Sequence, residues 1–130
     1  AASDEVVDYG EERATFGPPI AEHQPAQELL DDIRVDLETS RQLSRRAVES
    51  LENGDSDARL LSSMAKGYTA EKAHDATSNA LQVMGGEGLK TENRLERYFR
   101  DARVMPIPDG TTEIQKLIVG KEITGRSAYN

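Results

Sequence analysis

Apolar residues recur every three or four positions along nearly the whole chain, which places them on one face of an α-helix. No stretch alternates apolar and polar residues as a half-buried β-strand would. Gly17-Pro18-Pro19 and Asn53-Gly54 interrupt the pattern with residues that end helices. Asp55 or Ser56 is predicted to cap the helix that follows the second interruption. The pattern predicts helices over about residues 3–12, 24–52, 56–84, 92–101 and 112–124.

The two longest predicted helices must run in opposite directions, because only the tight Asn53-Gly54 turn joins them. The two shorter helices that follow can pack against this hairpin. We therefore predict an all-α fold, an antiparallel four-helix bundle, with residues 1–130 as one domain. The inward stripe of the second helix is predicted to hold Ala26, Leu30, Ile33, Leu37, Ser40, Ser44, Ala47 and Leu51. That of the third helix is predicted to hold Leu61, Met64, Ala65, Tyr68, Ala73, Ala76, Ala80 and Val83.

Composition narrows the classes of partner. The chain has 24 acidic and 16 basic residues, a formal net charge of -8, which disfavours nucleic acid and anionic membranes. It has no cysteine, which excludes disulfides and thiolate metal sites and fits a reducing cytoplasm; no metal site is predicted. No apolar run approaches the roughly 18 residues of a membrane span, and no basic, apolar leader directs export.

The kind of basic residue adds one further expectation. Only 5 of the basic residues are lysines and 11 are arginines. An acidic, lysine-poor surface suits a protein that stays soluble in concentrated salt, where charge repulsion is screened. A halophilic source and an ordinary acidic cytoplasmic protein both remain open.

Four segments carry motifs beyond the helical pattern, and each has a plain structural interpretation. An arginine followed by Gly-Pro-Pro ends a helix, and a Gly-Gly pair caps one. Three arginines and two acids over residues 96–103 form ion pairs on a surface helix. Asp109-Gly110 turns the chain, and Thr112 with Gln115 forms a capping box. The segments are Arg13–Ile20, Gln82–Gly86, Glu96–Arg103 and Pro108–Glu113.

In this order and spacing, the four segments resemble the C-terminal helical domain of the FAD-dependent acyl-CoA dehydrogenases. That family carries Glu-Arg-x-x-Arg-Asp-Ala-Arg, which residues 96–103 match, and we assign this segment no catalysis. It also carries Arg-x-x-Phe-Gly-x-Pro-Ile with a Gln a few residues on. This chain matches that motif at Arg13, Phe16, Gly17, Pro19, Ile20 and Gln24.

The resemblance implies FAD as cofactor, bound across a subunit interface in a homo-oligomer (dimer or tetramer). A guanidinium suits pyrophosphate oxygens, and glycines permit close approach of the dinucleotide to the backbone. His23 lies beside Gln24 and is as readily a structural residue. The residues implied to contact FAD are Arg13, Thr15, Phe16, His23, Gln24, Gln82, Gly85, Gly86, Thr111 and Glu113.

The resemblance also implies a catalytic carboxylate at Asp109. The family loop typically reads Tyr-Glu-Gly-Thr, and its Glu takes the α-proton of an acyl-CoA thioester while the β-hydrogen leaves as hydride to the flavin. The main-chain N–H of the same residue helps to hold the thioester carbonyl, and Gly110 is implied to contact substrate. An electron-transferring flavoprotein would then accept the electrons.

Two residues depart from the family loop, because Pro108 replaces Tyr and Asp109 replaces Glu. Aspartate is one methylene shorter, so its oxygens retreat by roughly 1 Å, and a misplacement of that size can cost on the order of a hundredfold in rate. Three outcomes stay open. The prolines move the loop inward, the substrate has another shape, for example branched or cyclic, or the activity is lost or changed.

Enzymes of this family are much longer than 130 residues, and the resemblance covers only their last domain. We therefore expect a fragment of a three-domain flavoenzyme, with its first helix cut short, that is inactive alone and has little flavin affinity. Two other functions remain open. One is a flavin oxidase of the superfamily that uses an Asp base on a non-CoA acid, such as a nitroalkane. The other is a helical oligomerisation module with no chemistry.

Overall fold

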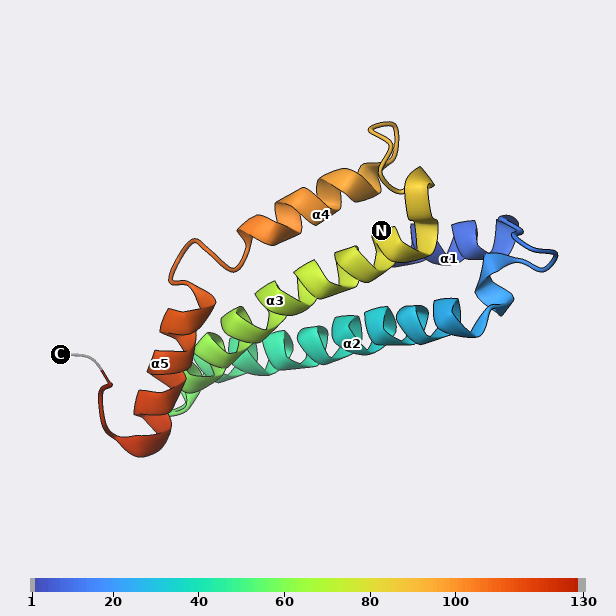
Figure 1. Ribbon diagram of the computed structural model, residues 1–130. Coiled ribbons are helices and arrows are strands. Elements are labelled where there is room, and N and C mark those ends of the chain that lie inside the picture. The colour runs from blue at the N-terminus through green and yellow to red at the C-terminus, as the bar shows by residue number, and fades with distance from the viewer. Residues whose placement is uncertain (1, 129–130) are drawn as a thin grey trace.

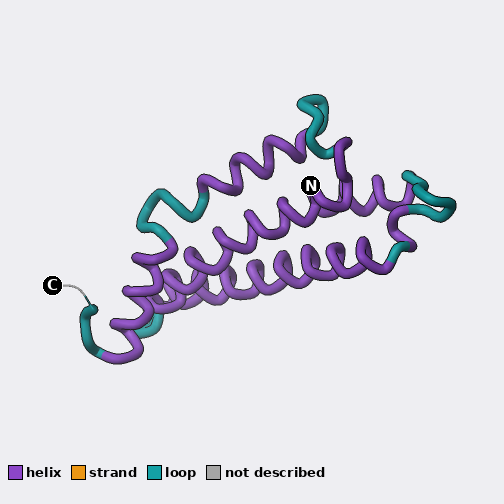
Figure 2. Tube along the Cα trace, viewed as in Figure 1, coloured by secondary structure: helices purple, strands orange, loops and turns teal. Residues whose placement is uncertain are grey.

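The computed structural model describes residues 2–128, and within them the regular structure is helical (Figures 1 and 2). The all-α prediction is confirmed, since the only β feature in that range is one isolated bridge between Ala14 and Pro19. No helix of these residues is both long and apolar enough to span a bilayer. The elements are α1 (Ala2–Glu12), η1 (Ile20–Glu22), α2 (Gln24–Asn53), α3 (Ala58–Met84), η2 (Gly85–Glu87), α4 (Arg94–Val104) and α5 (Thr112–Thr124).

Helix α3 organises the domain, because it packs against each of the other four α-helices. It forms a long antiparallel hairpin with α2, as predicted, and α4 then returns along its length (Figure 1). Helix α1 lies at the end of the hairpin where α3 finishes, and α5 lies toward the end where α3 begins. The domain is therefore elongated, with one set of loops at each end.

The main hydrophobic core lies where α1, α2, α3 and α4 meet. Val6 and Leu95 are fully buried there, so α1 and α4 are held to the last turns of α3 by their own apolar residues. The aromatic ring of His74 also packs against Phe99 of α4, with ring centroids 5.0 Å apart. The buried residues of this cluster are Val6, Ile33, Ala80, Val83, Met84 and Leu95.

The turn between α2 and α3 follows the prediction at its glycine and departs from it at the cap. Gly54 has φ 70°, and its N–H donates to the carbonyl oxygens of Leu51 and Ser50. Helix α3 begins at Ala58, later than the predicted cap at Asp55 or Ser56. Asp57 precedes it, and its carboxylate accepts a hydrogen bond from Ser50 Oγ at 2.7 Å. The Asp57 carboxylate therefore bonds across the turn to α2 and makes no cap bond to α3.

Part of the predicted inward stripe is open to solvent. Leu51, Met64 and Tyr68 are 57%, 38% and 37% exposed, and Ala73 is also exposed, so these four predictions were wrong. Met64 and Tyr68 line a cavity of about 400 Å³ between α2, α3 and α5, and Ala73 lines one of about 590 Å³ between α1, α2 and α3. The small side chains on the facing stripes leave these grooves unfilled.

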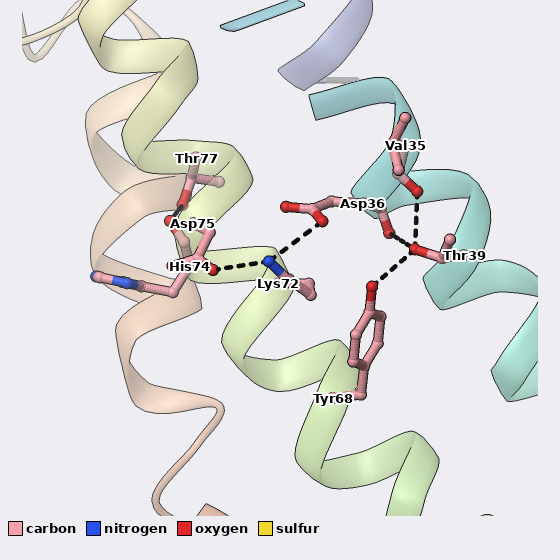
Figure 3. Close-up of polar contacts among 8 residues, drawn as sticks. All are labelled: Val35, Asp36, Thr39, Tyr68, Lys72, His74, Asp75 and Thr77. Atoms are coloured by element: carbon pink, nitrogen blue, oxygen red, sulfur yellow. Dashed lines mark hydrogen bonds and ion pairs between the residues drawn. The ribbon is translucent and has the colours of Figure 1, made fainter. Parts of the chain in front are cut away.

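Polar contacts tie α2 to α3 beside these grooves (Figure 3). Lys72 Nζ lies 3.4 Å from Asp36 Oδ1 and 3.3 Å from Asp75 Oδ2, and the hydrogen bond with Asp75 is the main cause of its raised pKa. Thr39 donates its hydroxyl to the Val35 carbonyl, so the 3.1 Å contact with Tyr68 is one in which Tyr68 donates. This bond to a surface hydroxyl accounts for the partial exposure of Tyr68.

Candidate functional site

Residues 13–20 form a small hairpin, which the sequence did not predict beyond its ending of α1. The Ile20 N–H donates to the Arg13 carbonyl at 2.8 Å, and the Thr15 N–H donates to the Pro18 carbonyl at 3.1 Å. Phe16 and Gly17 turn the chain with φ 57° and 115°. Because of this turn the Phe16 ring is fully exposed at the tip.

His23 supports this hairpin from the start of α2. Its Nε2 atom lies 3.0 Å from the Thr15 carbonyl oxygen, and since a carbonyl only accepts, that nitrogen carries the hydrogen. Gln24 is exposed next to it, with its amide 3.5 Å from Glu28. The structure therefore places Thr15 and His23 in one contact, while Phe16 and Gln24 face solvent.

The second predicted segment ends α3 close to this hairpin. Gly85 has φ 56°, and a Cβ at Gly85 or Gly86 would meet no atom within 4 Å, so the backbone is open to a ligand there. Gln82 is exposed one turn earlier. The pKa of Glu87 is lowered mainly by its hydrogen bond with Lys90 and to a small extent by Arg13. The hairpin that carries Arg13 and the glycine turn lie at the same end of α3 (Figure 1).

Asp109 lies on an exposed loop between α4 and α5. The loop is closed by a hydrogen bond from the Thr112 N–H to the Pro106 carbonyl at 3.1 Å. Asp109 has φ 55° and Gly110 has φ 87°, so two successive residues are left-handed. The Asp109 carboxylate makes no hydrogen bond or ion pair with residues 2–128, and the N–H groups of Asp109 and Gly110 find no acceptor there either.

The start of α5 differs from the predicted capping box of Thr112 and Gln115, which was wrong. Thr111 precedes the helix, and Thr112, already inside it, donates its hydroxyl to Glu71 Oε1 of α3 at 2.6 Å. Glu113 is the acid in the first turn of α5, where its own backbone N–H and then the Thr111 hydroxyl lower its pKa. Within residues 2–128 the Asp109 carboxylate makes no bond to the start of α5.

The helix between these loops carries exposed ion pairs and no buried polar group. Glu96 accepts hydrogen bonds from Arg100 Nε and the Arg100 terminal nitrogen at 2.8 and 3.1 Å, and Arg97 pairs with Asp101 at 3.5 Å. Exposed pairs one turn apart contribute only a few tenths of a kcal/mol each. This agrees with the structural role that we assigned to residues 96–103.

The structure brings the predicted residues together in two separate groups. Lys66 Nζ donates to the Met105 carbonyl at 3.0 Å and Thr112 bonds Glu71, so the Asp109 loop lies beside the first half of α3. The hairpin of residues 13–20 and the Gly85 turn lie at the far end of the same helix (Figure 1). At about 1.5 Å per residue, about 20 to 30 Å of α3 separates the two groups.

Comparison with known proteins identifies the family to which this chain is related. The sequence pattern of the acyl-CoA dehydrogenase C-terminal domain matches residues 1–124. The chain is 35% identical over 127 residues to cyclohexane-1-carbonyl-CoA dehydrogenase of Geobacter metallireducens, covering 98% of this chain and 33% of that protein. It is 40% identical over 119 residues to the mitochondrial short-chain specific acyl-CoA dehydrogenase of Sus scrofa, covering 92% of this chain and 29% of that one.

The comparison of structures leads to the same family as the comparison of sequences. The solved structure described as the FAD complex of PigA superposes with a TM-score of 0.90 and 27% identity, over 94% of this chain and 32% of that one. The chain thus spans about a third of the length of the proteins it matches. It belongs to the acyl-CoA dehydrogenase family and corresponds to the C-terminal helical domain of that family.

Proposed function

We propose that the protein carrying this domain is an FAD-dependent acyl-CoA dehydrogenase in which Asp109 is the base. One observation supports this most strongly. The Asp109 carboxylate is exposed and unpaired within residues 2–128, and Glu113 is the acid in the first turn of α5. A carboxylate that the fold does not use, on a left-handed turn before a helix, is available to a substrate presented by the other domains.

The proposed reaction removes two hydrogens from adjacent carbons of an acyl thioester. The Asp109 carboxylate takes the proton from the α-carbon, and the C–H electron pair forms the new α,β double bond. Bound FAD supplies the acceptor for the hydride that leaves the β-carbon. The unpaired N–H groups of Asp109 and Gly110 are suited to hold the thioester oxygen as negative charge develops on it.

The residues present fit a dinucleotide. Two segments at the same end of α3 carry an exposed arginine, a fully exposed aromatic ring and two glycines with open space around them. We propose that these residues, with Thr15, His23, Gln24 and Gln82, serve the FAD of a partner subunit, and that Thr111 and Glu113 lie beside the flavin that Asp109 faces. The separation along α3 supports this division between two copies.

For the substrate we propose an acyl-CoA whose α-carbon lies in a ring. A relative of the chain is named for cyclohexane-1-carbonyl-CoA, although one of similar identity is named for short-chain acyl-CoAs. We choose the cyclic acyl-CoA over the short-chain acyl-CoA because of the residue at position 109. Asp109 is roughly 1 Å shorter than the usual Glu, which leaves room for the extra ring carbon on the α-carbon.

The remaining assignments are proposals of the same kind. We propose that an electron-transferring flavoprotein reoxidises the flavin and that the enzyme is a homodimer or homotetramer in the cytoplasm. The absence of cysteine supports a reducing compartment. The net charge of -8 supports a salt-rich one. A place in fatty acid metabolism would follow for straight-chain substrates, whereas a cyclic substrate points to the breakdown of ring compounds.

The first test replaces the proposed base in the full-length, FAD-bound enzyme. Asp109→Asn is expected to slow flavin bleaching by substrate about 10²- to 10⁴-fold, the usual contribution of a general base, with FAD still bound. Asp101→Asn, an exposed aspartate on α4, is the matched control and keeps the rate. Near-normal bleaching by Asp109→Asn would remove Asp109 as the base.

The second measurement addresses substrate and class. With cyclohexane-1-carbonyl-CoA as substrate, the wild-type enzyme is expected to bleach faster than with butyryl-CoA, and Asp109→Glu is expected to reverse that order. If both acyl-CoAs leave the flavin oxidised while a nitroalkane drives oxygen consumption, the protein is an oxidase instead. A full-length protein that purifies without colour would be an oligomerisation module.

A further inference from the structure

Gln115 holds the loop that carries Asp109 through a buried side-chain amide. Only 8% of Gln115 is exposed, and its Nε2 atom donates to the carbonyl oxygens of Asp109 and Gly110, each at 3.2 Å. One amide group therefore engages two successive carbonyls. The side chain belongs to α5 but reaches back over the residues that precede the helix.

The two carbonyls belong to the two left-handed residues of the loop, with φ 55° at Asp109 and φ 87° at Gly110. A non-glycine residue in that region is strained and persists where surrounding contacts hold it. Gln115 supplies such contacts on both residues. We propose that Gln115 is a positioning residue, which sets the direction of the Asp109 carboxylate by fixing this turn.

The surroundings of Gln115 leave space for this contact. A Cβ at Gly110 would lie 2.8 Å from Gln115 Nε2, and a Cβ at Gly67 of α3 would lie 3.3 Å from Gln115 Cβ. Two glycines therefore flank the side chain, one at its amide and one at its stem. The bond from Thr112 to Glu71 fixes α5 against α3 at the same level. The Gln115 amide is therefore carried by a helix whose position against α3 is fixed.

The consequence for catalysis follows from the length of Asp109 and rests on its proposed role as base. A shift of about 1 Å in a reacting group can cost on the order of a hundredfold in rate. The aspartate side chain has few torsions with which to correct a displaced backbone. Loss of the two hydrogen bonds would therefore slow proton removal while leaving substrate binding to the other domains.

The test uses the full-length, FAD-bound enzyme. Gln115→Met removes both hydrogen bonds and keeps the length of the side chain. Gln27→Met is the matched control, because Gln27 Nε2 also donates to a loop carbonyl, that of Ala21, at 3.0 Å. We expect Gln115→Met to lower the rate of flavin reduction at saturating substrate about 10- to 100-fold with KM nearly unchanged. Equal rates in the two variants overturn the proposal.

Gly67→Ala is a second variant, for the case in which Gln115→Met does not retain FAD. Its Cβ would press on Gln115 Cβ from 3.3 Å and displace the side chain by a few tenths of an ångström. The same rate is expected to fall by about threefold or more, in proportion to the smaller shift. An unchanged rate in Gly67→Ala contradicts a positioning role.

A double variant separates positioning from general stability. In the Asp109→Asn background, Gln115→Met is expected to cause a clearly smaller further loss, because the carboxylate that it positions is already gone and only the N–H groups of the turn remain to be displaced. A further loss of the same size as in the wild-type background overturns the proposal. Near-normal flavin reduction by Asp109→Asn alone overturns the base assignment itself, and that outcome is read before any Gln115 variant is made.

Discussion

At the scale of single residues, both loops that carry predicted site residues use the same backbone arrangement. Each places a non-glycine residue in the left-handed region and follows it with a left-handed glycine. Phe16 (φ 57°) and Asp109 (φ 55°) are the only non-glycine residues with positive φ in the described part of the chain. Strain of this kind concentrates at functional sites, which agrees with the functional roles that we propose for these two loops.

Phe16→Asn is therefore expected to stabilise the domain by about 0.5–1 kcal/mol, since asparagine adopts a left-handed conformation more easily than phenylalanine. The ring is fully exposed, so its removal costs no burial. Urea unfolding of the 130-residue chain measures the change. Phe99→Asn is the contrasting control, because Phe99 packs on His74 and its loss should destabilise. A less stable Phe16→Asn would contradict this account of the hairpin.

At the scale of elements, the sequence predicted the helices well and their polar ends poorly. Helix α5 was predicted with both of its bounds, because Thr-Thr before a periodic stretch and Gly125 after it are local signals. The partners of Thr112 and Gln115 were not, since both bond outside their own helix turn. The partners of these two side chains are the left-handed turn before α5 and Glu71 on the neighbouring helix α3. Neither partner can be recognised from the spacing of residues within α5.

Glu113 gives this helix end a dependence on pH. Its pKa in the folded state is lowered, chiefly by its own backbone N–H, so it adds stability above its unfolded pKa and loses it as pH falls through the folded value. Glu113→Gln is expected to lower the urea midpoint at pH 7, and the gap to wild type should close in strong acid. Glu49→Gln, an exposed acid in the middle of α2, is the control. A gap that persists unchanged in acid would contradict the assignment.

At the scale of the whole molecule, the apolar stripes of α2 and α3 predicted which residues share a helix face. They did not predict how much of that face the other helices bury. Leu51 and Ala73 obey the helical period as well as Ile33 and Ala80 do, yet only the latter pair is buried, in the cluster that includes Val6 of α1 and Leu95 of α4. Coverage depends on where the shorter helices dock along the hairpin. In the same way, motif order predicted the site residues as a list, while their division between two ends of α3 emerged only from the fold.

That division has a genetic consequence. Arg13→Glu and Asp109→Asn each inactivate the proposed enzyme, but co-expressed in one cell the two mutant chains should complement one another. In a hybrid dimer, one site combines the intact Arg13 of the Asp109→Asn chain with the intact Asp109 of the Arg13→Glu chain, while the other site carries both defects. Activity recovered in purified hybrids, absent from either parent, checks this. If both residues served one site within a single copy, no hybrid would recover.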